Sequence, residues 1–150
     1  MNEYTDIKTP SYIIDLPALT KNLEILKNVE ERSGARILLA QKCYSVYQTY
    51  PLIAEYISGC TASGLFEARL GHEEMGKENH IFSPAYTESE FDEILKICDH
   101  ISFNSIAQWE RFKEKVFACP KKVSCGIRIN PEHSTQEHGI YDPCSEFSRL

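Results

Sequence analysis

The sequence has no apolar run long enough to cross a membrane, and its first residues lack the basic and apolar regions of a secretory signal. We therefore expect a cytoplasmic protein with no membrane partner. Basic residues are in the minority, with 16 Lys and Arg against 22 Asp and Glu and a net charge of -6. This balance argues against nucleic-acid binding and is compatible with a cationic substrate, although it also suits ordinary solubility.

Two common motifs are also missing. No Gly-x-Gly-x-x-Gly loop occurs, which argues against a Rossmann-type dinucleotide-binding domain. None of the six cysteines forms a Cys-x-x-Cys pair, so we expect reduced thiols and no zinc motif. Cys60, Cys98 and Cys125 stand in apolar segments and are expected in the core. His133 and His138 fit no standard ligand spacing, so no metal site is predicted.

Strand-like and helix-like segments alternate along the chain. Short apolar strand signals begin near residues 37, 60, 80, 100 and 123, a spacing of about twenty residues. Asp15 and Ser105 are typical N-cap residues, and Thr87 with Glu90 three residues later matches a capping box. Gly34 and Gly76 are typical of helix ends. Helices are therefore expected over about 16–33, 48–57, 65–75, 87–98 and 105–116.

This alternation is the signature of successive β-α units with parallel strands. Without a phosphate-binding glycine loop, a (βα)8 TIM-type barrel is the best match, and such a barrel needs about 250 residues. We therefore predict an α/β fold in which residues 16–150 form the N-terminal half of a barrel, as a fragment of a longer protein. Segment 130–150 is either a loop that lines the active site or a stretch disordered for lack of packing partners.

The stretch Ile37–Ser45 organises the chain, because a buried strand here ends on a lysine. Side chains alternate along a strand, so Leu38, Ala40 and Lys42 share one face, and Gln41 points into the helix layer, where it needs a hydrogen-bond partner. Burial would lower the pKa of Lys42 and free its amine as a nucleophile toward carbonyls. The alternative is a lysine that extends from the strand end into water.

A set of further stretches extends over nearly the whole chain. They are the Thr-Pro-x-Tyr-x-x-Asp opening at 9–15, Ile37–Ser45, Thr61–Ser63, Glu67–Gly71, Phe82–Tyr86, Phe103–Ser105, Gln108–Phe112, Cys125–Pro131, Pro143–Cys144 and Ser148–Leu150. Together they resemble the fold-type III pyridoxal-phosphate enzymes, which include ornithine and diaminopimelate decarboxylases and alanine racemase. Within that group the resemblance is greatest to the carboxynorspermidine (carboxyspermidine) decarboxylase family.

The resemblance implies a pyridoxal 5'-phosphate cofactor and four site residues. Lys42 matches the catalytic lysine that holds the cofactor as a Schiff base. Arg128 matches an arginine near the cofactor ring, and Ser63 and Glu67 match a segment close to the cofactor. Each of the last three also has a structural explanation: Arg128 as the partner of a carboxylate inside the barrel, Ser63 as a helix cap, and Glu67 as a solvated carboxylate.

The implied activity is decarboxylation of carboxynorspermidine or carboxyspermidine to norspermidine or spermidine in polyamine biosynthesis, by a homodimer acting on a small cationic amino acid. By the same resemblance, Ser11–Ile14 is a strand of an otherwise missing β domain, so residues 1–15 and 16–150 belong to different domains. The phosphate site would come from later strands, so the fragment alone is expected to be inactive. A diaminopimelate-type decarboxylase, a non-catalytic pyridoxal-phosphate carrier and an inactive truncated product remain as alternatives.

Overall fold

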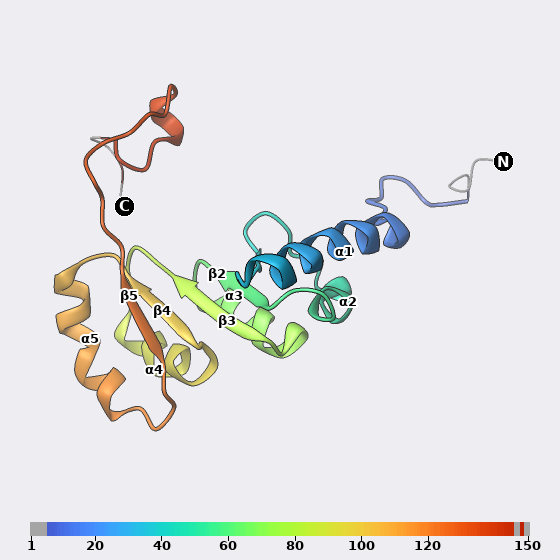
Figure 1. Ribbon diagram of the computed structural model, residues 1–150. Helices are drawn as coiled ribbons and strands as arrows, with labels where there is room; N and C mark the ends of the chain where they lie inside the picture. The colour runs from blue at the N-terminus through green and yellow to red at the C-terminus, as the bar shows by residue number, and fades with distance from the viewer. Residues whose placement is uncertain (1–5, 146–147, 149–150) are drawn as a thin grey trace.

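Five parallel strands form one sheet in the order β1-β2-β3-β4-β5, so each strand lies beside its predecessor in the sequence. The computed structural model describes residues 6–145 and 148. The strands are β1 (Leu38–Ala40), β2 (Gly59–Ala62), β3 (Glu78–Phe82), β4 (His100–Phe103) and β5 (Ser124–Ile127). Figure 1 labels β2 to β5 and shows β5 at one edge of the sheet, and β1 forms the other edge beside β2. The predicted α/β arrangement of consecutive β-α units is confirmed.

A helical segment precedes β1 and stands in every gap between strands. None of the helices in the described part of the chain is long and apolar enough to span a bilayer. The elements are α1 (Leu16–Ser33), the 3-10 turn η1 (Tyr47–Thr49), α2 (Tyr50–Ala54), α3 (Leu65–Leu70), the π-helical turn η2 (Gly71–Met75), α4 (Glu88–Ile97), α5 (Ile106–Ala118) and the 3-10 turn η3 (Gly139–Tyr141).

The ends of the long helices follow from their capping residues. Asp15 accepts a hydrogen bond from the Ala18 N–H at 2.9 Å, and Ser105 accepts one from the Gln108 N–H at 3.1 Å. Gly34 ends α1 with a φ of 71°, a left-handed conformation that glycine adopts without steric cost. The predicted caps at Asp15 and Ser105 are therefore confirmed.

Two local expectations are not met in the described residues. Thr87 does not form the predicted capping box, because its hydroxyl donates to the Glu90 carboxylate at 2.6 Å instead of capping a backbone N–H. Cys125 is exposed and not in the core, because no described helix covers that face of β5. Ser11–Ile14 has no described strand beside it to pair with, so its assignment to a strand of an otherwise missing β domain stays a prediction. The division of the chain into residues 1–15 and 16–150 stays a prediction.

The predicted loop 130–150 is largely irregular and exposed where the structure describes it, apart from the single turn η3. Residues 1–5, 146–147 and 149–150 belong to the two terminal segments and lie outside the described residues. Figure 1 shows the described C-terminal stretch extending away from the sheet beyond β5. This arrangement does not distinguish a loop that lines the active site from a stretch disordered for lack of packing partners, so both explanations of segment 130–150 stay predictions.

One face of the sheet is covered by helices and the other is open, and side chains of successive strand residues point to the two faces in turn. The side chains of Cys60, Ile81 and Ile101 point toward the helices and are fully buried or nearly so. One core cluster between β2–β4 and α3–α5 contains Ala62, Leu65, Ala68, Ile81, Tyr86, Phe91, Ile94, Leu95, Cys98, Ile101, Phe103 and Phe112. A second cluster beneath α1 and α2 contains Leu23, Tyr50, Ile53, Ala54, Ile57, Cys60 and Met75.

Two buried amides interrupt the apolar helix layer. Asn79 is fully buried, and its Nδ2 donates to the carbonyls of Ala68 at 2.8 Å and Ile97 at 3.2 Å, which ties α3 and α4 to β3. Gln41 is 1 % exposed and accepts a hydrogen bond from the Tyr50 hydroxyl at 3.3 Å. The predicted position of Gln41 in the helix layer is confirmed, although its Nε2 has no partner among the described residues.

We predict that Gly71→Ala destabilises the protein by about 1–3 kcal/mol, the usual cost of overpacking a core. A Cβ at this position would collide with Cys60 Sγ and lie 3.0 Å from Gln41 Nε2. Gly64→Ala is the matched control, because its backbone is extended and nothing lies within 4 Å of the added carbon. The free energy of unfolding from denaturant titration of each variant measures the difference. Equal stabilities would show that this contact relaxes at no cost.

Candidate functional site

The predicted site residues gather where the strands end. Parallel strands present their carboxyl ends at one edge of a sheet, and Lys42, Ser63 and Arg128 each follow a strand by one or two residues. By strand alternation, Ser63 and Arg128 continue the open face that Thr61 and Gly126 begin, whereas Lys42 lies in the turn that follows β1. The structure therefore brings these residues to the same end of the sheet.

Lys42 lies in a turn, and its side chain is exposed. The strand ends at Ala40, whose carbonyl accepts hydrogen bonds from the N–H groups of Cys43 at 3.1 Å and Tyr44 at 3.3 Å. The expected burial of the lysine is therefore wrong for the described chain, because the turn brings the side chain out of the strand. Within residues 6–145 the Lys42 amine takes part in no hydrogen bond or ion pair, which leaves it available to a ligand.

Ser63 and Glu67 contact each other directly. The Ser63 N–H donates to Glu67 Oε2 at 2.6 Å, so the carboxylate closes the loop between β2 and α3. Ser63 is not the helix cap, since Gly64 occupies that position, and Glu67 is not simply solvated. The Asn104 N–H donates to Gln108 Oε1 at 2.6 Å in the same way after β4. Both loops at the carboxyl edge are thus held by a side chain from the first turn of the following helix.

Arg128 extends the sheet by one hydrogen bond and then contacts an aromatic ring. Its N–H donates to the Phe103 carbonyl at 2.8 Å, and its guanidinium carbon lies 5.8 Å from the centre of the Phe82 ring. A cation at this distance from an aromatic face is attracted by the ring quadrupole. No described carboxylate pairs with Arg128, so the charge of Arg128 remains available on the open face.

Tyr86 joins two strand ends and was not singled out by the sequence. Its hydroxyl accepts a hydrogen bond from the Ser83 N–H at 3.1 Å and donates to the Ser102 carbonyl at 2.8 Å. Desolvation by burial raises the pKa of Tyr86, so the hydroxyl stays protonated and remains a donor. The sequence did offer one signal for this role: Tyr86 ends a Ser-Pro-Ala-Tyr loop that directly follows a strand. This contact fixes the loop that follows Phe82.

No family model matches the chain, but individual proteins do. It is 43% identical over 144 residues to a carboxynorspermidine/carboxyspermidine decarboxylase of Herminiimonas arsenicoxydans, covering 96% of this chain and 38% of the relative. It is 44% identical over 147 residues to a protein of the same name from Campylobacter jejuni, covering 98% of this chain and 37% of the relative. A carboxyaminopropylagmatine decarboxylase of Synechocystis is 34% identical over 146 residues, covering 97% of this chain and 37% of the relative.

Solved structures give the same result. The crystal structure of carboxynorspermidine decarboxylase complexed with norspermidine from Campylobacter jejuni matches with a TM-score of 0.83 and 42% identity, over 96% of this chain and 35% of that one. A D-threonine aldolase from Filomicrobium marinum matches with a TM-score of 0.72 over 83% of this chain and 35% of that one. At 16% identity, the second match concerns the fold alone.

The predicted resemblance to carboxynorspermidine decarboxylases is confirmed over nearly the full length of this chain. The chain spans 37–38% of the length of the relatives that it matches. A five-stranded parallel sheet that covers about a third of the matched structures agrees with the predicted half of a barrel.

We predict that Tyr86→Phe destabilises the protein by about 1–3 kcal/mol, because the partly buried Ser102 carbonyl and Ser83 N–H would lose this hydrogen-bond partner. Tyr12→Phe is the control, since Tyr12 is fully exposed. The thermal unfolding midpoints of the two variants test this. If the two variants were equally stable, the hydroxyl would not hold the two strand ends together.

Proposed function

We propose that this chain is the part of a pyridoxal-phosphate-dependent decarboxylase that carries the cofactor lysine, Lys42. The complete enzyme would convert carboxynorspermidine or carboxyspermidine to norspermidine or spermidine and CO2. Since the chain spans 37–38% of its relatives, the proposal concerns a protein that also supplies the rest of the barrel. The position of Lys42 carries it: an exposed amine with no described partner at the carboxyl end of the first strand.

The residues of the site suit the cofactor. Pyridoxal phosphate requires a primary amine for covalent attachment and charged or polar groups near its ring, and when bound it supplies an electron sink for the charge that departing CO2 leaves behind. Lys42 supplies the amine, without an internal ion pair that would have to break. Arg128 supplies a positive charge on the open face at the same end of the sheet, supported by the Phe82 ring. These groups fit the cofactor chemistry that the resemblance implies.

Two further side chains would fix the backbone at the carboxyl edge of the sheet. Glu67 and Gln108 hold the backbone at Ser63 and Asn104 through hydrogen bonds of 2.6 Å. Groups fixed in this way do not have to reorganise when a substrate binds, which lowers the cost of reaching the transition state. A direct contact of Ser63 or Glu67 with the cofactor stays a prediction, as do the homodimer and the cytoplasmic location.

The choice of substrate follows from the degree of similarity. The two relatives named carboxynorspermidine/carboxyspermidine decarboxylase are 43% and 44% identical to the chain, against 34% for the carboxyaminopropylagmatine decarboxylase. The matched crystal structure at 42% identity contains norspermidine, the product expected of this reaction. A carboxylated polyamine is therefore the favoured substrate class, and carboxyaminopropylagmatine and diaminopimelate are the competitors to test.

The first prediction concerns the attachment of the cofactor. Borohydride reduction of the complete, cofactor-loaded protein should attach the cofactor permanently to one lysine. Peptide mapping should find this cofactor label on the peptide that contains Lys42. Lys42→Arg should abolish both the label and CO2 release, because a guanidinium does not form the covalent link. Lys77→Arg is the control, since Lys77 is also exposed but precedes β3 at the other end of the sheet. A label on any other lysine would remove Lys42 from this role.

The second prediction concerns the substrate. In a competition assay, the complete enzyme should release CO2 from carboxynorspermidine or carboxyspermidine with a kcat/KM at least tenfold above that for carboxyaminopropylagmatine or diaminopimelate. A tenfold ratio corresponds to about 1.4 kcal/mol of differential transition-state binding. If the enzyme preferred either competitor, the proposed decarboxylase activity would stand but the proposed substrate would be wrong.

A further inference from the structure

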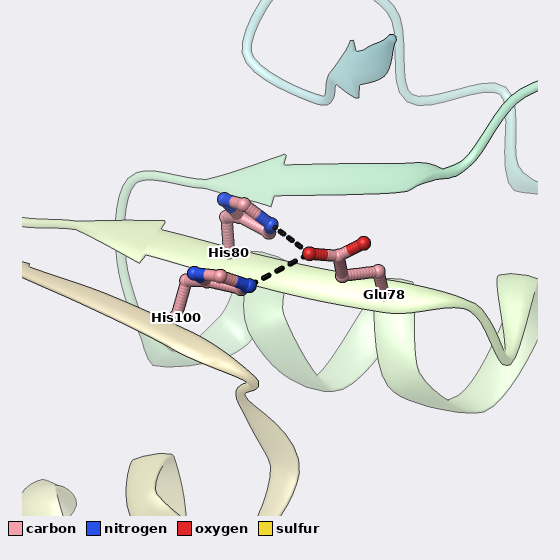
Figure 2. Close-up of side chains that lie close together, drawn as sticks. All are labelled: Glu78, His80 and His100. Atoms are coloured by element: carbon pink, nitrogen blue, oxygen red, sulfur yellow. Dashed lines mark hydrogen bonds and ion pairs between the residues drawn. The ribbon is translucent and has the colours of Figure 1, made fainter. Parts of the chain in front are cut away.

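Three ionisable side chains meet at the end of the sheet opposite to Lys42. Glu78 and His80 stand on β3 and His100 on β4, all on the open face. His80 Nε2 lies 2.8 Å and His100 Nε2 2.7 Å from the same atom, Glu78 Oε1, as Figure 2 shows. The two imidazoles are stacked, with ring centres 4.0 Å apart and an interplanar angle of 20°.

This convergence results from strand register. His80 is the register partner of His100, so the two side chains stand side by side on neighbouring strands. Glu78 precedes His80 by two residues and therefore points to the same face. All three side chains are partly buried, with exposed fractions of 14% for Glu78, 28% for His80 and 38% for His100. Regular strands thus fix the positions of three potential ligands before any ion binds.

We propose that Glu78, His80 and His100 form a binding site for a divalent transition-metal ion of the zinc class. Each residue offers one ligand atom, and the three atoms lie within 4.8 Å of one another. Imidazole nitrogen and carboxylate oxygen bind Zn²⁺ at about 2.0–2.2 Å, so an ion between the three atoms would replace the two present contacts. Two histidines and one carboxylate leave room for water in the remaining coordination positions.

Arg36 prepares the carboxylate for this role. Its guanidinium pairs with Glu78 Oε2, the oxygen that faces away from the histidine contacts, and so orients the group that would bind the ion. Partners of this kind, which orient a metal ligand from outside, commonly contribute to metal affinity.

Positive charges near the site set its selectivity. Arg36 and Lys122 line the same cavity as Glu78 and His100, and the nearby Asp99 carboxylate is already paired with Lys121 at 2.9 Å. Purely electrostatic binding of a cation is weak in such surroundings, so affinity must come from the bonds to nitrogen. Mg²⁺ and Ca²⁺ prefer oxygen ligands and are expected not to bind, whereas Zn²⁺, Co²⁺ and Cu²⁺ are expected to bind.

A metal at this place would stabilise the protein. It would join β3 to β4 at the amino ends of the strands, the end of a barrel whose residues contribute to stability more than to catalysis. An ion that binds only the folded state raises the unfolding temperature, and the rise grows with the logarithm of the free ion concentration once this exceeds the Kd. We therefore expect Zn²⁺ to raise the unfolding temperature of the metal-free protein and to leave its turnover unchanged.

The test uses the complete protein, stripped of metal with a chelator and titrated with Co²⁺. Visible absorption bands should rise to one equivalent and disappear on addition of Zn²⁺. A near-ultraviolet thiolate band should be absent, which separates this site from the exposed Cys43 and Cys125. His80→Gln and His100→Gln should each weaken Co²⁺ binding at least tenfold, whereas His72→Gln, a control at an exposed position outside the cluster, should have no effect.

Two results would overturn the proposal: no saturable Co²⁺ binding by the wild-type protein, or equal affinities in all three variants. Because His80 and His100 variants can fail to fold, a second measurement uses the wild type alone. Electron paramagnetic resonance of the Cu²⁺-loaded protein counts the imidazoles bound to the ion, and two are expected. None or one would show that Glu78 and the histidines form only a hydrogen-bonded cluster.

Discussion

The parallel register of the five strands is the constraint on which the rest of the structure depends. Neighbours that run in the same direction place side chains of equal register next to each other and collect like ends at one edge. Lys42 and Arg128 lie at the same carboxyl edge for this reason, although they follow the two outermost strands, β1 and β5, and 86 positions separate them in the sequence. The same rule places His80 beside His100 at the opposite edge. A single geometric relation therefore places the predicted site residues at one end of the sheet and the Glu78 cluster at the other.

Local signals in the sequence were sufficient for the helices and for the order of the elements. Asp15 and Ser105 cap their helices as expected because capping depends on residues only three positions apart. The cluster around Glu78 could not be predicted, since His80 and His100 are brought together only by register, which no local pattern reveals. Lys42 was correctly placed at a strand end, but its exposure depends on the turn after Ala40, which the apolar run did not indicate.

Buried polar side chains mark where the helix layer departs from simple apolar packing. Asn79 satisfies both of its donor hydrogens with carbonyls of two helices, so its burial also fixes how α3 and α4 sit on the sheet. Gln41 is less well satisfied, with one contact to Tyr50 and an amide nitrogen without a described partner. Gly71 leaves the room that this group occupies next to Cys60. The packing of Gln41 behind β1 therefore depends on the absence of a Cβ at Gly71 as much as on the contact with Tyr50.

The sequential strand order has a consequence for synthesis on the ribosome. Partner residues on neighbouring strands are only 19 to 24 residues apart, from Gly59 with Glu78 to His100 with Ser124, so every strand joins one that left the ribosome shortly before it. Contacts between segments so near in the chain close small loops, which keeps the entropic cost of each addition low. Each unit can thus dock on a finished edge while the next is still being translated, and an exposed edge persists only until the following unit arrives.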